Sequence, residues 1–201
     1  QGLRRAVAEK QQKDDEAYSQ LTARVETLQR KLSEMEVEAT LDALTKVGNR
    51  RRFDSALRRL VGTANEAGSS LALAMIDVDH FKKINDTHGH PVGDRVLLCV
   101  AQWLSRGVRQ TDVVCRYGGE EFAILLPGAS ATEVEGRMKK LLMDIANSSY
   151  EYDVLGRKEK VQFTVSCGLV DLDTNETEEL FVKRADEALY EAKKKGRNRV
   201  V

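Results

Sequence analysis

Hydrophobic residues follow one spacing before residue 40 and other spacings after it. In residues 1–39 an apolar or aromatic side chain recurs in steps of three and four, at Tyr18, Leu21, Val25, Leu28, Leu32 and Met35. This spacing, with charged flanks, predicts the a/d seam of a coiled coil, although Gln11 and Asp14 interrupt it upstream. The alternative is one solvated helix packed on its own domain. A helix this polar has little to stabilise it alone, so the pattern favours a coiled-coil homodimer.

From residue 40 to residue 201 the pattern is that of a globular α/β domain. Helical spacing predicts helices over residues 49–61, 93–107, 131–147 and 178–195, the last ended by Gly196. Short apolar or alternating runs predict strands over residues 71–76, 113–117, 122–126 and 161–170. Asp42 or Thr45 is a candidate cap for the first helix. This interleaving predicts a mixed central β-sheet flanked by helices.

The strands at residues 113–117 and 122–126 enclose Gly118-Gly119-Glu120-Glu121. The Gly-Gly pair predicts a two-residue hairpin turn, because both central positions of such a turn can need a positive φ. Sheet packing does not require two carboxylates at that tip. Glu120 and Glu121 are instead suitable ligands for a hard cation.

A second pair of acids, Asp77 and Asp79, ends the apolar run at residues 71–76. A carboxylate at the end of a buried strand is costly unless it is paired, hydrogen-bonded or bound to metal. The simpler interpretation is that both acids cap the turn after the strand. Together with the hairpin acids, Asp77 predicts a shared Mg²⁺ site that would also hold waters and substrate phosphates.

Asn85 and Asp94 flank a loop that contains His88 and His90. An amide and a carboxylate together can recognise the donor and acceptor edges of guanine. Asp94 is equally a candidate N-cap of the following helix. The two histidines lack a third zinc ligand at suitable spacing, so they are better explained as loop residues.

Two charged segments have both a structural and a functional interpretation. Arg109 and Asp112 lie in a predicted surface turn, where such residues are commonly solvated. Lys193 and Arg197 lie at a basic helix end, which suits the helix dipole and also suits a triphosphate. The sequence pattern does not choose between these interpretations.

Composition narrows the class of protein. Lys plus Arg and Asp plus Glu both number 32, so a protein that binds nucleic acid through bulk charge is excluded. No apolar run is long enough to span a bilayer. Cys99, Cys115 and Cys167 are widely spaced in apolar runs, which predicts buried free thiols and a cytoplasmic location. The chain could then be the cytoplasmic part of a larger sensor or membrane protein.

Taken in order, these motifs resemble the GGDEF family of diguanylate cyclases. The resemblance runs from about Asp42 to Val200 and rests on Asp77-Val78-Asp79-His80-Phe81-Lys82, Asn85-Asp86, Gly89-His90, Gly93-Asp94, Gly118-Gly119-Glu120-Glu121-Phe122 and Ala185-Asp186-Glu187-Ala188-Leu189-Tyr190. It implies a fold related to the polymerase palm and to nucleotide cyclases over residues 40–201. It also implies that two GTP molecules condense into cyclic di-GMP and two pyrophosphates.

The resemblance implies a role for each matching residue. Asp77, Glu120 and the Val78 carbonyl would bind Mg²⁺, or Mn²⁺ in its place, and Glu121 would be a further ligand or an electrostatic partner. Glu120 would also be the base for the attacking 3′-hydroxyl. The implied guanine-binding residues are Asn85 and Asp94, and the implied phosphate-binding residues are His80, Phe81, Lys82, Lys193 and Arg197.

The resemblance further implies regulation and assembly. Arg109 and Asp112 match the RxxD inhibitory site, which binds the product, with Arg137 or Lys140 as a candidate additional residue. Each domain would hold one GTP, so two domains have to meet, and the helix over residues 1–39 would hold them together, in a homodimer or in a tetramer. Two positions depart from the family pattern: Lys46 replaces a glycine, and Gly48 stands where other residues are common.

Three rival functions remain from the sequence alone. A catalytically inactive domain that senses GTP or cyclic di-GMP would be expected to lose Asp77 or the hairpin acids, and all are present. A dimerising scaffold would not need intact metal, guanine and phosphate positions together. A cyclase acting on ATP would share the metal site, and the pairing of Asn85 with Asp94 favours guanine over adenine.

Overall fold

The apolar run after residue 70 forms the central strand, β1 (Leu71–Val78), in the computed structural model. β1 lies between β3 (Glu121–Pro127) and β6 (Val165–Asp171), and β2 (Val113–Gly118) completes the strand order β2-β3-β1-β6. These strands pair antiparallel. Parallel bridges lie at the two edges, from Gly48 to Cys115 and from Cys167 to Val200. The predicted α/β fold with a helix-flanked mixed sheet is therefore confirmed, its parallel contacts being edge bridges.

The structure describes residues 21–22, 24–29, 39–154 and 156–201, and the chain divides into two compact units at residues 40 and 41. In the first unit, residues 21–22 and 24–29 are helical. Leu21, Val25 and Leu28 of the predicted seam are exposed there. The other seam residues lie outside the described residues, so the coiled coil stays a prediction. No described helix is both long and apolar enough to cross a membrane.

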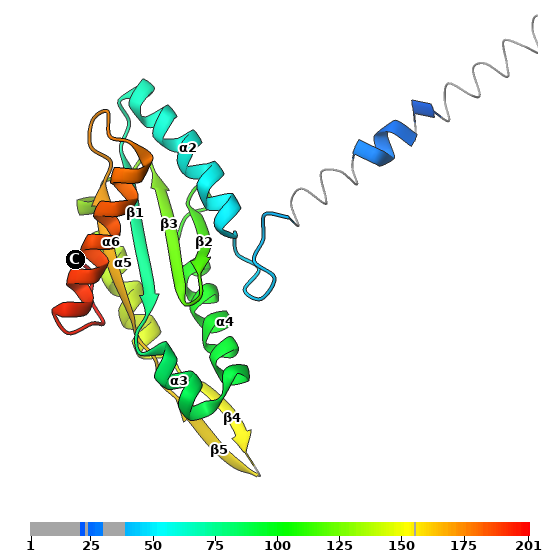
Figure 1. Ribbon diagram of the computed structural model, residues 1–201, viewed down its shortest axis with the longest axis vertical. Helices are drawn as coiled ribbons and strands as arrows, with labels where there is room; N and C mark the ends of the chain where they lie inside the picture. The colour runs from blue at the N-terminus through cyan, green and yellow to red at the C-terminus, as the bar shows by residue number, and fades with distance from the viewer. Residues whose placement is uncertain (1–20, 23, 30–38, 155) are drawn as a thin grey trace, which may run out of the picture. The chain divides into compact units, whose positions relative to one another are not determined.

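Helices cover both faces of the sheet (Figure 1). α2 (Arg50–Ala67) and α6 (Glu178–Lys194) pack on the face that carries Leu71, Leu73 and Met75 of β1. α4 (His90–Arg106) and α5 (Ala131–Ala146) pack on the opposite face, with Ala72, Ala74 and Ile76. Because side chains alternate between the faces of a strand, β1 is buried on both sides.

Three helix starts are fixed by local chemistry. The N-cap of α2 is Asn49, whose side chain accepts from the Arg52 amide at 3.1 Å. The prediction of Asp42 or Thr45 as this cap is wrong, because Asp42 instead accepts from the Thr45 amide within the preceding turn. α5 begins with a capping box formed by Ser130 and Glu133. α6 begins after Thr177, whose hydroxyl accepts from the Leu180 amide at 3.4 Å.

Three elements were not predicted from the sequence. They are the short helix α3 (Phe81–His88) and the separate two-stranded hairpin of β4 (Tyr150–Val154) and β5 (Arg157–Val161). The predicted strand over residues 161–170 is accordingly divided. β5 ends at Val161 and β6 begins at Val165, so the segment between them connects the hairpin to the sheet.

α6 approaches β6 at a glycine. A Cβ on Gly168 would overlap the backbone of Ala185 and Leu189 in α6. The absence of a side chain therefore sets how closely this helix lies against the sheet.

The three cysteines are free. Cys115 and Cys167 are buried, and burial raises the pKa of each thiol to about 12. Cys99 is half-buried, and burial raises its pKa as well. Both fully buried thiols are thus inert components of the core, as predicted, while Cys99 lies at its border.

Candidate active site

The end of β1 and the hairpin bring two carboxylates together. Asp77 lies opposite Glu121 in the antiparallel register of β1 and β3. Asp77 shares the side of β1 with Leu73 and Met75, so it faces α6. The Val78 amide donates to the Glu120 carbonyl at 3.3 Å, which ties the hairpin turn to the strand end. All four residues predicted to meet at a metal site are therefore close together in the backbone: Asp77 pairs with Glu121, and Val78 is bonded to Glu120.

Several charged side chains lie close together at the end of β1. Burial is the main cause that raises the pKa of Asp77, and the neighbouring Asp79 adds to it. Burial also raises the pKa of Glu121, followed by the negative charge of Asp77. The Lys193 ammonium lies 2.8 Å from Asp77 Oδ2 and partly offsets both effects. A cation placed between these acids would relieve the remaining repulsion.

Asp79 differs from Asp77 although it is only two residues away. It accepts from Thr164 Oγ1 and Ser166 Oγ, both at 2.7 Å, and from the Asn198 amide at 3.1 Å. A carboxylate with three donors is satisfied within the protein. Asp79 therefore joins the start of β6 to the segment after α6 and is a structural acid, although these three donors lie outside the turn after β1 that it was expected to cap.

The hairpin turn has the predicted length of two residues but lies one residue further along the chain. β2 ends at Gly118 and β3 begins at Glu121, so the turn residues are Gly119 and Glu120. Of the two glycines only Gly119 has a positive φ, of 36°. The prediction of Gly118 and Gly119 as the two turn residues is therefore wrong by one position, because Gly118 ends β2 and Glu120 occupies the second position of the turn.

Arg116 holds this turn in place. Its Nε and Nη2 both donate to the Gly119 carbonyl, at 2.9 and 2.7 Å. Its Nη1 donates to Asp42, 3.2 Å away, and this guanidinium contributes to lowering the Asp42 pKa. Arg116 therefore connects the turn that carries Glu120 to the first residues of the domain. No local sequence pattern predicts this contact, because Asp42 is 74 residues away.

The predicted phosphate-binding residues lie around the same strand end. His80 has a left-handed backbone with φ 57°, and α3 begins at the next residue, Phe81. Lys82 is exposed on the first turn of α3. Arg197 follows α6, and its charge opposes the rise that burial causes in the Asp77 pKa, so it lies near that carboxylate. The amino end of α3 and the basic end of α6 thus border the acidic edge, an arrangement that suits a polyphosphate.

The predicted guanine-recognition pair is divided between α3 and α4. Asn85 Oδ1 is buried and has no hydrogen-bond partner among the described residues. A Cβ on Gly93 would overlap that oxygen, so the glycine keeps space beside it. Asp94 is exposed within α4, which begins at His90 after Gly89. The alternative of Asp94 as an N-cap is therefore wrong.

At the predicted inhibitory turn, Asp112 is engaged and Arg109 is exposed. Asp112 Oδ2 accepts from the Arg109 amide at 2.8 Å and from Arg137 Nη1 at 3.2 Å. Only 2% of the Asp112 side chain is exposed. Lys140 instead pairs with Asp144 at 2.6 Å. Of the two candidate additional residues, Arg137 is thus the one in contact with this turn.

The loop histidine His88 contacts a tyrosine of the β4–β5 hairpin. His88 Nδ1 lies 2.7 Å from the Tyr152 hydroxyl, which supports its interpretation as a structural residue. Within the described residues, no group of three or more His, Cys, Asp and Glu side chains could hold a metal ion without further ligands.

Asp186 of α6 belongs to one of the motifs that resemble the GGDEF family, but no role was predicted for it. Burial raises its pKa, with Arg50 and Lys193 acting in the opposite direction.

Comparison with known proteins agrees with this geometry. The family model described as "Diguanylate cyclase, GGDEF domain" matches residues 39–199. Among curated relatives, the chain is 33% identical over 99% of its length to diguanylate cyclase DgcP of Pseudomonas aeruginosa. It is 39% identical over 81% of its length to response regulator PleD of Caulobacter vibrioides. The chain spans 31% and 36% of those two relatives, about a third of each.

Solved structures of a GGDEF domain and of a diguanylate cyclase are also similar to this chain. The coiled coil and GGDEF domain of DgcB from Caulobacter crescentus, crystallised in complex with c-di-GMP, matches with a TM-score of 0.86 and 34% identity, covering 93% of this chain and 97% of that one. Diguanylate cyclase SiaD of Pseudomonas aeruginosa, in complex with its activator SiaC, matches with a TM-score of 0.80 and 33% identity, covering 96% of this chain and 73% of that one.

Proposed function

The chain belongs to the GGDEF family of diguanylate cyclase domains, and we propose that it condenses two GTP molecules into cyclic di-GMP and two pyrophosphates. The observation that carries this proposal is the register of Asp77 against Glu121, beside a turn that presents Glu120. Burial raises the pKa values of Asp77 and Glu121, and a bound cation would compensate for this effect.

The acidic edge fits a divalent metal whose remaining ligands come from substrate. Asp77, Glu120 and the Val78 carbonyl would bind Mg²⁺ or Mn²⁺, and Glu121 would add negative charge beside them. Few protein ligands and several phosphate oxygens are typical of such sites. When bound, the metal would stabilise the charge that develops on the phosphates and on the attacking oxygen.

The surrounding residues would place GTP at this edge. Asn85, with its unpartnered oxygen, and Asp94 would recognise guanine. The backbone at His80 and Phe81, together with Lys82, Lys193 and Arg197, would hold the triphosphate. Lys193 contacts Asp77 in the present structure, so it would move toward the phosphates when substrate and metal bind. Glu120 would then accept the proton of the attacking 3′-hydroxyl.

Catalysis by this route requires two copies of the domain, because each 3′-hydroxyl attacks the GTP held by the other. The exposed seam residues Leu21, Val25 and Leu28 support a dimer through the helix of residues 1–39. Feedback control would use the Arg109–Asp112 turn, where the exposed guanidinium of Arg109 would bind a phosphate of cyclic di-GMP and Arg137 would complete the site.

The test is product formation from GTP and Mg²⁺ by the purified chain, stripped of bound nucleotide and analysed by chromatography. Glu120→Ala should lower the rate at least about 100-fold, since it removes a metal ligand and the base. Glu135→Ala is the matched control, because Glu135 lies in an exposed ion pair on α5. A folded, dimeric chain that forms no cyclic di-GMP would contradict the proposal.

A further inference from the structure

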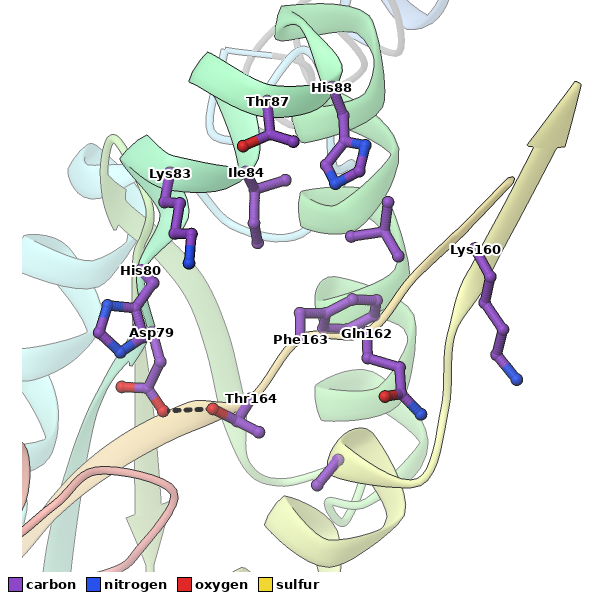
Figure 2. Close-up of a pocket in the computed structure, with 12 residues that line it drawn as sticks. Asp79, His80, Lys83, Ile84, Thr87, His88, Lys160, Gln162, Phe163 and Thr164 are labelled. Atoms are coloured by element: carbon purple, nitrogen blue, oxygen red, sulfur yellow. Dashed lines mark hydrogen bonds between the residues drawn. The ribbon is translucent and has the colours of Figure 1, made fainter. Parts of the chain in front are cut away.

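A pocket lies between α3 and the segment joining β5 to β6 (Figure 2). Its volume is about 440 Å³. Asn85 does not line it and packs toward Gly93 of α4 instead. The residues assigned above to guanine recognition, to metal binding and to product inhibition do not line it either. Of the proposed substrate residues, only His80 reaches its edge.

The floor of this pocket is apolar. Ile84 of α3 and Phe163 of the connecting segment lie next to each other in Figure 2, and Val161 completes the surface. All three residues are buried in the core, so the floor is held rigidly. A rigid apolar floor that includes an aromatic ring favours a flat organic group over a bare inorganic ion.

The rim of the pocket is positively charged. Lys83 and Lys160 are exposed and lie on opposite sides of Phe163 in Figure 2. Within the part of the chain that the structure describes, neither lysine forms an ion pair, although Glu151 lies opposite Lys160 in the β4–β5 register. Asp79 is the one lining carboxylate, and it is already saturated by three donors. The pocket therefore favours an anionic ligand.

We propose that this pocket binds a small organic anion, whose flat apolar body lies on Ile84 and Phe163 and whose phosphate or carboxylate pairs with Lys83. α3 gives the site a consequence for the proposed cyclase. The same helix carries His80 at its start and Asn85 in its middle. A negative charge beside Lys83 would lower the positive potential at the phosphate-binding end of α3 and so weaken GTP binding.

The probe is phenyl phosphate, added to the full chain in the absence of GTP and followed by amide NMR shifts and calorimetry. Phenol and inorganic phosphate serve as its two halves. We expect phenyl phosphate to shift the amides of Ile84 and Thr164 and to bind at least about tenfold more tightly than either half, because both surfaces are used. Binding no tighter than that of inorganic phosphate would overturn the organic part of the proposal.

Two lysine variants locate the anion. Lys83→Met should weaken phenyl phosphate about tenfold, since it removes a charge-assisted contact while keeping the length of the side chain. Lys158→Met is the matched control on β5, outside the pocket, and should change binding less than twofold. Shifts confined to the surroundings of Lys82 and Lys193, or equal losses in both variants, would overturn the assignment. These readouts do not depend on cyclase activity, so they stand apart from the proposed function.

Discussion

Asp77 at the end of β1 and Asp112 before β2 are both shielded carboxylates, with 11% and 2% of their side chains exposed. Their surroundings differ. Asp77 lies against Glu121 and near Asp79, and its pKa is raised. Asp112 accepts from a backbone amide and from Arg137. An acid among other acids can recruit a cation, whereas an acid supplied with donors fixes a turn.

Among the substitutions that test this contrast, Asp77→Asn is expected to have the largest effect. We expect a loss of cyclase activity of at least about 100-fold, because the amide is a poor ligand for a hard cation. The free energy of unfolding at neutral pH without metal should not fall. A raised carboxyl pKa means that the contribution of Asp77 to stability declines as pH rises above the ordinary pKa of an aspartate, 3.8, and the neutral amide avoids that decline.

The measurements are initial rate with Mg²⁺ and chemical unfolding in EDTA. A variant that loses activity together with several kcal/mol of stability would show that Asp77 is a structural acid like Asp112, and the contrast would be lost.

Arg109→Ala tests the exposed residue of the turn that also contains Asp112. If Arg109 binds a product phosphate, the concentration of cyclic di-GMP that halves the rate should rise about tenfold, the value of one charge-assisted contact. The initial rate in product-free enzyme should stay near that of the parent. Lys140→Ala is the control, because Lys140 is paired with Asp144 and does not contact the turn. Equal inhibition of the variant and the parent would argue against an inhibitory site here.

Asp112→Asn tests the shielded carboxylate of the same turn. It should lower the free energy of unfolding by about 1–2 kcal/mol, because Arg137 loses its charged partner, and its buried Nη2 has no hydrogen-bond partner among the residues that the structure describes. Asp144→Asn removes an exposed ion pair and should cost less than about 0.5 kcal/mol. Urea unfolding of both variants gives the comparison, and a cost for Asp112→Asn as small as that of the control would contradict the structural role.

The smallest expected effect is at Lys46, which borders the same pocket as Arg109 and Asp112. Lys46 has φ 61°, a left-handed conformation that glycine adopts without strain. Lys46→Gly should therefore raise the free energy of unfolding by up to about 1 kcal/mol. Lys46→Ala keeps a Cβ and should give no such gain. A gain from both variants would point to the lysine charge instead of the backbone.

The elements that the sequence predicted are those in which one periodicity dominates. The eight buried residues of β1 and the apolar faces of α2, α5 and α6 needed only local pattern reading. α3 was missed because it spans eight residues and starts at His80, whose side chain does not cap it. The β4–β5 hairpin was missed because most of its residues pack outside the core, so they carry no clear alternation.

The candidate site shows the same limit. The motif residues could be chosen from the sequence because their chemistry is out of place in a sheet. The contacts of Arg116 and Asp79 could not, because each joins segments more than 70 residues apart. The departure at Lys46 was visible, but only the structure shows that the lysine keeps the backbone conformation suited to glycine. Likewise, Gly48 is explained by the lack of room for a Cβ beside Cys115.

Gly168 of β6 has a consequence that reaches the far end of α6. Because this residue lacks a Cβ, the helix rests directly on the strand, and that spacing determines where the basic carboxyl end of α6 lies relative to Asp77. Even a single added methyl group would push the helix outward, and the displacement would reach Lys193, which lies about one turn beyond Leu189 in the same helix. The distance between the Lys193 ammonium and Asp77 thus depends on a residue that has only a hydrogen atom as its side chain. A search for functional side chains would not select such a position.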